Sequence, residues 1–366
     1  MQPSRSTFAA LALVALSAFS RTACGDPGAV RNRSTAQLAE GVYAIQHEDG
    51  TDDFPQGNTT VIIGAREVMV IDSCYLPSSA RADIAQIRAW TDKPVKYLVN
   101  THWHNDHIGG NAAYLAAFPG LAILAHPQTR EMMDLRIPGY VTRYIDEASA
   151  MAAQRRVLQA QVDGGTDESG KTLSVAERTE ARNSLARYRN AVDEFKSFRY
   201  QSPTVTFESE LKIDLGNREV RVRHPGRGNT GGDLIAYLPQ EKILVTGDLL
   251  DHPVPYAFGG YPSEWAATLG RLAGLDIVAI VPGHGGVLRD KTHLRRVARL
   301  ISRVVEGVNA LLATRGSAAT VEEARNAIDL SEFRQAMAGD DKESAEFFDA
   351  SMASLVRIAF NEARQR

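Results

Sequence analysis

The chain has few cysteines, little excess charge and no long hydrophobic run. Its 366 residues include only Cys24 and Cys74, so a disulfide framework is excluded and one bridge is the most that could form. Lysine and arginine number 41 against 44 acidic residues, for a net charge of −3. Because nucleic acid is bound by clustered positive charge, and no long basic run is present, no nucleic-acid partner is expected. What remains, with 44% hydrophobic residues, is the composition of an ordinary globular protein.

The N-terminus has the pattern of a secretory signal peptide. Arg5 supplies a positive charge, and residues 7–20 are an uninterrupted stretch of small and apolar side chains. This stretch is shorter than the roughly 20 residues that span a bilayer as a helix, so no membrane span is expected. We therefore predict that residues 1–23 are a signal peptide and that the mature protein is exported, to the periplasm or outside the cell. A lipid anchor on Cys24 is the lesser alternative, because Arg21 is the wrong residue for a lipoprotein signal.

Short β-branched runs alternate with helical patterns along most of the chain. Apolar residues recur at helical spacing in residues 79–91, between runs that look like buried strands. This alternation predicts an α/β protein in which helices and sheets form layers. A helical C-terminal extension is predicted over residues 301–366, with breaks near Gly316 and Gly339. The expected strands are residues 42–46, 59–63, 68–71, 95–100, 121–125, 211–215, 220–223, 234–238 and 243–245.

A helical segment, residues 128–202, separates the two β-rich halves. It carries two amphipathic stripes, one over residues 144–162 and one over residues 181–195. A glycine-containing turn joins the stripes, and Ser174 with Glu177 forms a capping box before the second one. We predict an inserted helical hairpin, which serves either as a lid over a site or as a structural or dimerising element.

Three of the nine histidines cluster directly after the strand predicted to end at Asn100. Alternation along an extended segment puts His102 and His104 on the same side, and the turn that follows directs Asp106 and His107 to a second position nearby. Imidazole and carboxylate groups at this spacing are typical of a transition-metal site. Two adjacent metal ions are therefore possible.

Residues 101–110 resemble the signature loop of the metallo-β-lactamase superfamily. The family's Thr-His-x-His-x-Asp-His-x-Gly-Gly reads here Thr-His-Trp-His-Asn-Asp-His-Ile-Gly-Gly. Further family elements follow in the expected order within residues 36–300, namely Asp72 after an early strand, residues 228–233 before a strand, Asp248 after one and His284 in a Pro-Gly-His-Gly turn. The resemblance implies a four-layer αββα sandwich, the metallo-β-lactamase fold, with a dinuclear zinc site at one edge of the two sheets.

The resemblance also implies a role for each residue of the site. His102 and His104 would bind the first metal, and Asp106, His107 and His284 the second. Asp248 would bridge both metals, Asp106 would also act in catalysis, and Asp72 would hold a ligand or the ligand loop in place. One departure concerns the first metal, because Asn229 stands where the family has a third histidine. With an amide there, we expect one or two zinc ions per chain, and His224, upstream on the same loop, is the alternative ligand.

Three further features adjoin the predicted site. The loop of residues 251–260 combines prolines, glycines and aromatic residues, and its Tyr256 and Phe258 either contact substrate or anchor the loop on the C-terminal helices. Cys74 is expected to be buried and inert, outside the ligand set. His47 has no partner at a ligand spacing and is expected to lie at the surface or to cap an element.

The function implied by the resemblance is zinc-dependent hydrolysis of a small-molecule substrate. A metal-bound hydroxide would cleave a carbonyl ester, lactone, thioester or amide bond. Hydrolysis of β-lactam antibiotics is an alternative, although Asp248 resembles the thioesterase and lactonase branches more than the β-lactamases, which usually carry Cys or Ser there. Two alternatives from other classes stay open: an iron-dependent sulfur oxidoreductase, and a non-catalytic metal-binding protein. The sequence does not specify the oligomeric state.

Overall fold

A computed structural model describes residues 33–47 and 56–365. The predicted signal peptide, residues 1–23, and Cys24 lie outside the described residues, as do the side chains of Tyr144 and Met151.

The first half of the chain builds a seven-stranded sheet whose strands follow the chain order, β1 to β7. Strands β1 to β4 pair antiparallel, and β4 to β7 pair parallel, so the last four strands end at the same edge of the sheet. Its strands are β1 (Arg33–Ala39), β2 (Val42–His47), β3 (Thr59–Ile63), β4 (Val68–Ile71), β5 (Val95–Val99), β6 (Ala122–Ala125) and β7 (Val205–Thr206). The sequence pattern missed β1 and β7.

The second half builds a five-stranded sheet in the order β12-β11-β10-β9-β8. Strands β11 and β12 are parallel neighbours, and their C-terminal ends lie together at one edge. The strands are β8 (Glu210–Asp214), β9 (Glu219–Arg223), β10 (Ile235–Leu238), β11 (Ile243–Gly247) and β12 (Ala279–Pro282).

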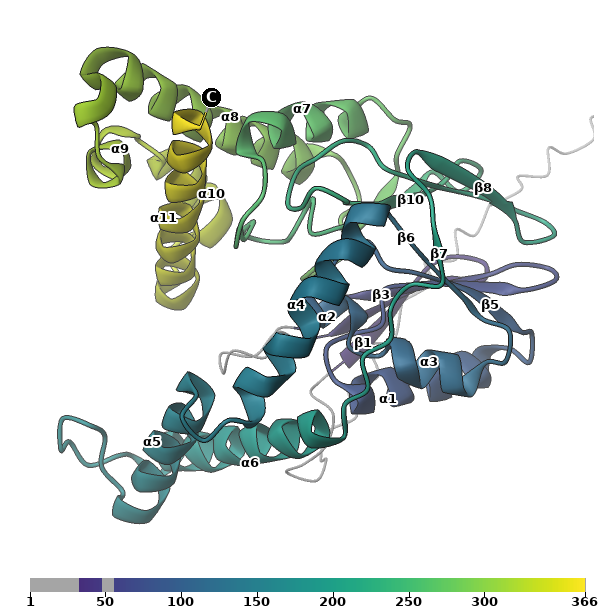
Figure 1. The fold of residues 1–366 in the computed structure, drawn as a ribbon, viewed down its shortest axis with the longest axis horizontal. Coiled ribbons are helices and arrows are strands. Elements are labelled where there is room, and N and C mark those ends of the chain that lie inside the picture. The colour runs from purple at the N-terminus through teal and green to yellow at the C-terminus, as the bar shows by residue number, and fades with distance from the viewer. Residues whose placement is uncertain (1–32, 48–55, 366) are drawn as a thin grey trace, which may run out of the picture.

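The two sheets and their helices form four layers (Figure 1), as predicted. Side chains alternate between two cores, so that Leu124 faces the second sheet while Ile123 faces α1 (Pro77–Trp90) and α3 (Asn111–Ala117). On the second sheet, Ala236 faces the first sheet while its neighbour Tyr237 faces α7 (Pro262–Ala273) and α8 (Thr292–Arg315). The αββα architecture therefore follows from strands that are apolar on both faces.

The insert contains three helices, α4 (Pro127–Ile145), α5 (Ala150–Gly164) and α6 (Val175–Ser197). The single helix expected over residues 144–162 was wrong, because the chain stops at Ile145 and restarts with Ser149 as the N-cap of α5. Helices α5 and α6 pack side by side away from the sheets (Figure 1), and the predicted capping box of Ser174 and Glu177 is present. Helix α4 instead packs Met133 and Ile137 against the loop that follows β5.

The C-terminal extension continues directly from α8, which runs through residue 300, where we placed the boundary. Gly316 and Gly339 end helices with φ of 55° and 59°, so the two predicted breaks are confirmed. The remaining helices are α9 (Val321–Ala327), α10 (Ser331–Ala338) and α11 (Lys342–Arg364), and α11 packs against α7 and α8. Among the residues that the structure describes, no helix is both long and apolar enough to cross a lipid bilayer.

Candidate metal centre

The histidine-rich loop leaves the C-terminal end of β5 and turns into the short helix α2 (Asn105–Ile108). It is held from both sides, because the backbone N–H of Leu234 donates to the carbonyl of Thr101 at 2.7 Å and Trp103 packs on α4. The carboxyl ends of β11 and β12 bring Asp248 and His284 to the same place. The candidate ligands therefore meet where strand ends of both sheets converge.

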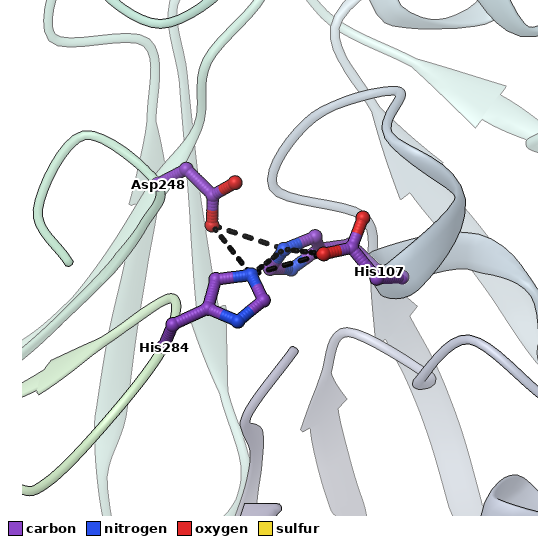
Figure 2. Close-up of side chains that lie close together, drawn as sticks. His107, Asp248 and His284 are labelled. Carbon is purple, nitrogen blue, oxygen red and sulfur yellow. Dashed lines mark hydrogen bonds and ion pairs between the residues drawn. The ribbon is translucent and has the colours of Figure 1, made fainter. Parts of the chain in front are cut away.

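One group of donor atoms comes from Asp106, His107, Asp248 and His284, all within 4.8 Å of one another. His107 Nε2 lies 2.9 Å from Asp248 Oδ1 and 3.3 Å from His284 Nε2, and His284 Nε2 lies 2.9 Å from Asp106 Oδ2. Figure 2 shows the two imidazole rings and the Asp248 carboxylate pointing toward one common position. The structure thus assembles the ligand set predicted for the second metal.

A second group comes from His102, His104 and Asp248. His102 Nε2 lies 3.0 Å from His104 Nδ1 and 3.2 Å from Asp248 Oδ2, and His104 Nδ1 lies 3.8 Å from the same oxygen. Asp248 therefore directs Oδ1 to one group and Oδ2 to the other, as a bridging carboxylate must. Gly283 is required beside it, because a Cβ there would lie 2.0 Å from Asp248 Oδ1.

Asp72 and Thr101 orient two of the imidazoles from behind. Asp72 Oδ2 accepts from His107 Nδ1 at 2.8 Å and from the Thr101 hydroxyl at 2.8 Å, while its Oδ1 accepts from the Thr101 backbone N–H. Because the Thr101 hydroxyl donates to Asp72, it accepts from His102 Nδ1, 3.0 Å away. Asp72 and Thr101 thus each accept an Nδ1–H, which directs Nε2 of both rings toward the donor groups, the supporting role predicted for Asp72.

The electrostatics of the centre favour a cation. Burial lowers the pKa of His102 to about 4, so this ring is neutral at pH 7. Burial works against ionisation of Asp106 and Asp248, yet the surrounding imidazoles hold the pKa of each carboxyl below its usual range. Burial likewise opposes a charge on His107, but Asp248 and Asp106 raise its pKa well above the ordinary value. Two ionised carboxylates in a buried pocket therefore attract positive charge.

The donor set fits zinc. Imidazole nitrogens and carboxylate oxygens are ligands that zinc prefers, and each group offers three or four of them. Asp248 Oδ1 is buried and makes no hydrogen bond within the described part of the chain, so a cation would satisfy it. The centre accordingly has both the donor chemistry and the charge for metal ions.

Asn229 and His224, the two candidates for a further ligand of the first metal, differ in their hydrogen bonds. Asn229 is buried, and neither amide atom of its side chain has a hydrogen-bond partner among the described residues. His224 bonds through Nδ1 to the carbonyl of Asp233 at 2.8 Å and packs against His126, and it belongs to neither donor group. Asn229, rather than His224, is thus the side chain left with polar atoms to satisfy.

The aromatic loop after Asp248 touches both the centre and the C-terminal extension. Phe258 is 64% exposed, and its ring centroid lies 5.6 Å from that of His104. Tyr256 contacts Phe258 and stacks on Phe347 of α11. Two α11 hydroxyls, on Ser351 and Ser354, donate to carbonyls of this loop. The loop is therefore anchored on α11, one of the two roles considered for it, with Phe258 at the rim of the centre. Contact of the loop with substrate stays a prediction.

Two features escaped the sequence pattern or contradict it. Asp251 is buried near the centre, and burial together with Asp248 raises its pKa well above the usual range, although only its position three residues after Asp248 hinted at this. The expectation for His47 was wrong, because its side chain is buried and contacts Cys74 and Asp83. Cys74 is buried, as expected.

A sequence model described as the metallo-beta-lactamase superfamily matches residues 52–284. This chain belongs to the metallo-β-lactamase superfamily. The match contains every candidate ligand, from the histidine-rich loop to His284, and it ends before the helical extension.

Individual relatives match at low identity. A linear primary-alkylsulfatase of a Pseudomonas species is 23% identical over 242 residues, which are 64% of this chain and 42% of that protein. A type 2 metallo-β-lactamase of Bacillus cereus is 31% identical over 96 residues, 24% of this chain and 37% of that protein. The chain thus spans less than half the length of these curated relatives.

Solved structures show the same fold. A double mutant of a sec-alkyl sulfatase superposes with a TM-score of 0.59 at 17% identity, covering 90% of this chain and 50% of that one. A metallo-β-lactamase from Pontibacter korlensis gives a TM-score of 0.50 at 18% identity, covering 74% of this chain and 99% of that one.

Proposed function

We propose that this superfamily member is a zinc-dependent hydrolase that binds two metal ions and cleaves an ester-type bond in a small molecule. The observation that carries the proposal is the position of Asp248, whose two carboxylate oxygens face two separate groups of imidazole nitrogens. A carboxylate whose two oxygens face different ligand groups can bridge two metal ions about 3.5 to 4 Å apart.

Each residue has its own task in this centre. His102 and His104 would hold the first zinc, and His107, His284 and Asp106 the second, with Asp248 shared. Bound zinc would polarise the scissile bond and lower the pKa of water from 15.7 to about 7. Asp106 is ionised at neutral pH, so it can accept a hydrogen bond from the attacking water and orient it toward the substrate. Thr101 and Asp72 keep the imidazole lone pairs turned inward.

The rim of the centre favours a substrate with an apolar substituent. Phe258 exposes most of its ring next to His104, and Phe347, stacked on Tyr256, is 46% exposed. Large apolar side chains at the mouth of a polar centre supply binding energy to the part of a substrate that does not react. A carbonyl ester, lactone, thioester or amide carrying such a group is our first candidate.

An alkyl sulfate ester is the second candidate. It is favoured by the extent of the similarity to the linear primary-alkylsulfatase, which runs over 242 residues, whereas the type 2 β-lactamase of Bacillus cereus matches over 96. β-Lactam hydrolysis stays an alternative on the strength of that shorter match.

The test combines metal analysis with a substrate panel. Protein purified without chelator is analysed for zinc and iron, and assayed with p-nitrophenyl esters, a lactone, a thioester, an alkyl sulfate and nitrocefin. Zinc with turnover of one class supports the proposal and names the bond. Iron in place of zinc would redirect the centre to sulfur oxidation, and zinc without turnover of any class would leave a metal-binding protein.

Asp106→Ala supplies the mechanistic control. We expect hydrolysis to fall by roughly 10² to 10⁴-fold, with an unchanged far-ultraviolet circular dichroism spectrum. Asp214→Ala, which removes an exposed carboxylate on β8, is the matched variant and should keep full activity. An unchanged rate in Asp106→Ala would contradict the assignment.

We further propose that the enzyme works outside the cytoplasm. The basis is the charged and apolar pattern of residues 1–23. Fractionation of expressing cells, with mass spectrometry of the mature N-terminus, tests this and also detects a lipid on Cys24. A chain that keeps Met1 and stays in the cytoplasm would refute it.

A further inference from the structure

A second cluster of metal-ligating side chains shares no residue with the Asp248 centre. It consists of His47 at the end of β2, Cys74 after β4 and Asp83 in α1. His47 is 4% exposed, and Cys74 and Asp83 are completely buried. The three side chains come from different elements, so the fold rather than a local motif assembles them.

The donor atoms of this cluster form a closed triangle. Asp83 Oδ2 lies 3.0 Å from His47 Nε2 and 3.1 Å from Cys74 Sγ, and the sulfur lies 3.3 Å from the same nitrogen. A neutral thiol and a neutral imidazole can each donate one proton to Asp83. The third edge then joins two groups that have no proton left to share, so hydrogen bonding satisfies only two of the three contacts.

These separations match those of the Asp248 centre. Tetrahedral zinc with ligand distances of 2.0 to 2.3 Å would hold such atoms about 3.3 to 3.6 Å apart. The observed distances are a few tenths of an ångström shorter, as are the 2.9 Å contacts of His107 with Asp248 and of His284 with Asp106. Small outward movements of the side chains therefore make room for an ion in both places.

The surroundings of the triangle are those of an oriented ligand set. Arg33 donates to Asp83 Oδ1 at 2.8 Å, which leaves Oδ2 for the centre of the triangle. The Thr59 hydroxyl lies 3.3 Å from the sulfur. A dication would balance a thiolate and a carboxylate, with the Arg33 charge outside them, and partners that fix a ligating carboxylate are typical of metal sites.

The backbone at Cys74 is also held in an unfavourable conformation. Its φ is 65°, in the left-handed region that side chains other than glycine seldom adopt. The backbone N–H of Gly109 donates to the Cys74 carbonyl at 2.9 Å and so ties this residue to the histidine-rich loop. Such a conformation directs the thiol into the triangle, and strain of this kind clusters at functional positions.

We propose that His47, Cys74 and Asp83 form a separate, buried zinc-type metal site. Thiolate, imidazole and carboxylate together suit zinc, and a closed site without solvent access is structural rather than catalytic. An ion there would join β2, α1 and the segment after β4, directly behind the loop that carries the catalytic ligands. This inference does not depend on the proposed hydrolysis, because it uses none of the residues of the Asp248 centre. That centre contains no sulfur, so a signal from a metal-bound thiolate distinguishes the two sites.

Cobalt substitution of the full chain tests the site. Cobalt bound to a thiolate gives an intense near-ultraviolet charge-transfer band, and the chain has only two cysteines. We expect the band in the wild-type protein and in Cys24→Ser, the matched control, and its loss in Cys74→Ser. Zinc analysis of the same proteins should show one ion fewer per chain in Cys74→Ser than in Cys24→Ser.

A second variant covers the case in which Cys74→Ser does not fold. His47→Gln keeps the thiol and removes one ligand, so its band should weaken or shift. Absence of the band from the wild-type protein, or its persistence in folded Cys74→Ser, would overturn the proposal and leave a hydrogen-bonded cluster. The spectrum of Asp248→Ala should keep the thiolate band, which separates this site from the catalytic centre.

Discussion

Replacing Asp72 by asparagine tests whether one hydrogen bond sets the tautomer of His107. The two side chains have the same shape, and asparagine tolerates the φ of 61° at this position as well as aspartate does. The substitution therefore changes the hydrogen-bonding character of one atom and little else. Asp72 accepts three bonds, two from Thr101 and one from His107 Nδ1, whereas the amide nitrogen of asparagine accepts none.

The amide must place its NH2 group on one side or the other. If the NH2 group takes the place of Oδ1, it faces the Thr101 backbone N–H, and two donors lie 2.8 Å apart with no acceptor between them. If the NH2 group instead takes the place of Oδ2, it donates one proton to His107 Nδ1, and the Thr101 hydroxyl can rotate to accept the other. The second orientation is the better one, and it moves the imidazole proton to Nε2, the atom that faces Asp248 at 2.9 Å. The ligand atom then loses its lone pair.

The expected effect is a 10 to 100-fold loss of zinc affinity at the group containing His107, or about 1.4 to 2.8 kcal/mol. Competition with a chromophoric zinc chelator measures it, and nitrogen chemical shifts of the His107 ring show which ring nitrogens carry a proton. Asp214→Asn, the same change at an exposed position, should leave zinc affinity unchanged. Wild-type affinity in Asp72→Asn, with the proton moved to Nε2, would refute the reasoning.

Three further predictions concern the first donor group, the rim and the pH dependence. Asn229→His should tighten zinc binding by about tenfold or more, near 1.4 kcal/mol, since imidazole is the better ligand; an unchanged zinc titration would mean that residue 229 faces away from the metal. Phe258→Ala should raise KM for an apolar substrate about tenfold with kcat little changed, because covering an exposed phenyl ring contributes roughly 1.5 kcal/mol, and an equal fall in kcat would contradict a binding role. Burial lowers the pKa of His293 to about 4, from 6.5, so the unfolded chain binds more protons between these values and stability is lost as the pH falls from 6.5 toward 4. Urea denaturation of the metal-free protein should show this loss, of the order of 2 to 3 kcal/mol, reduced in His293→Gln; identical pH profiles would show that another group is responsible.

The sequence alone determined the features that depend on neighbours along the chain. The spacing of His102, His104, Asp106 and His107 on a strand-end loop depends only on local geometry, and the structure brings all four into the two donor groups. The capping box at Ser174 and the breaks at Gly316 and Gly339 are local in the same sense, since a cap or a left-handed residue acts within one turn of helix. Most of the strands were likewise visible as short apolar or alternating runs, whereas β1 and β7 contain no fully buried residue and were missed.

Only the tertiary structure decided which distant residues meet. The division of the Asp248 oxygens between two groups depends on how β11 approaches the loop after β5, and no sequence period encodes that approach. The contact of Tyr256 with Phe347 depends on α11 folding back against α7 and α8. His47 showed no ligand spacing because its partners, Cys74 and Asp83, come from a loop and a helix that reach it only when the first sheet is assembled. Contacts between segments far apart in the chain depend on packing of whole layers, which a local pattern cannot specify.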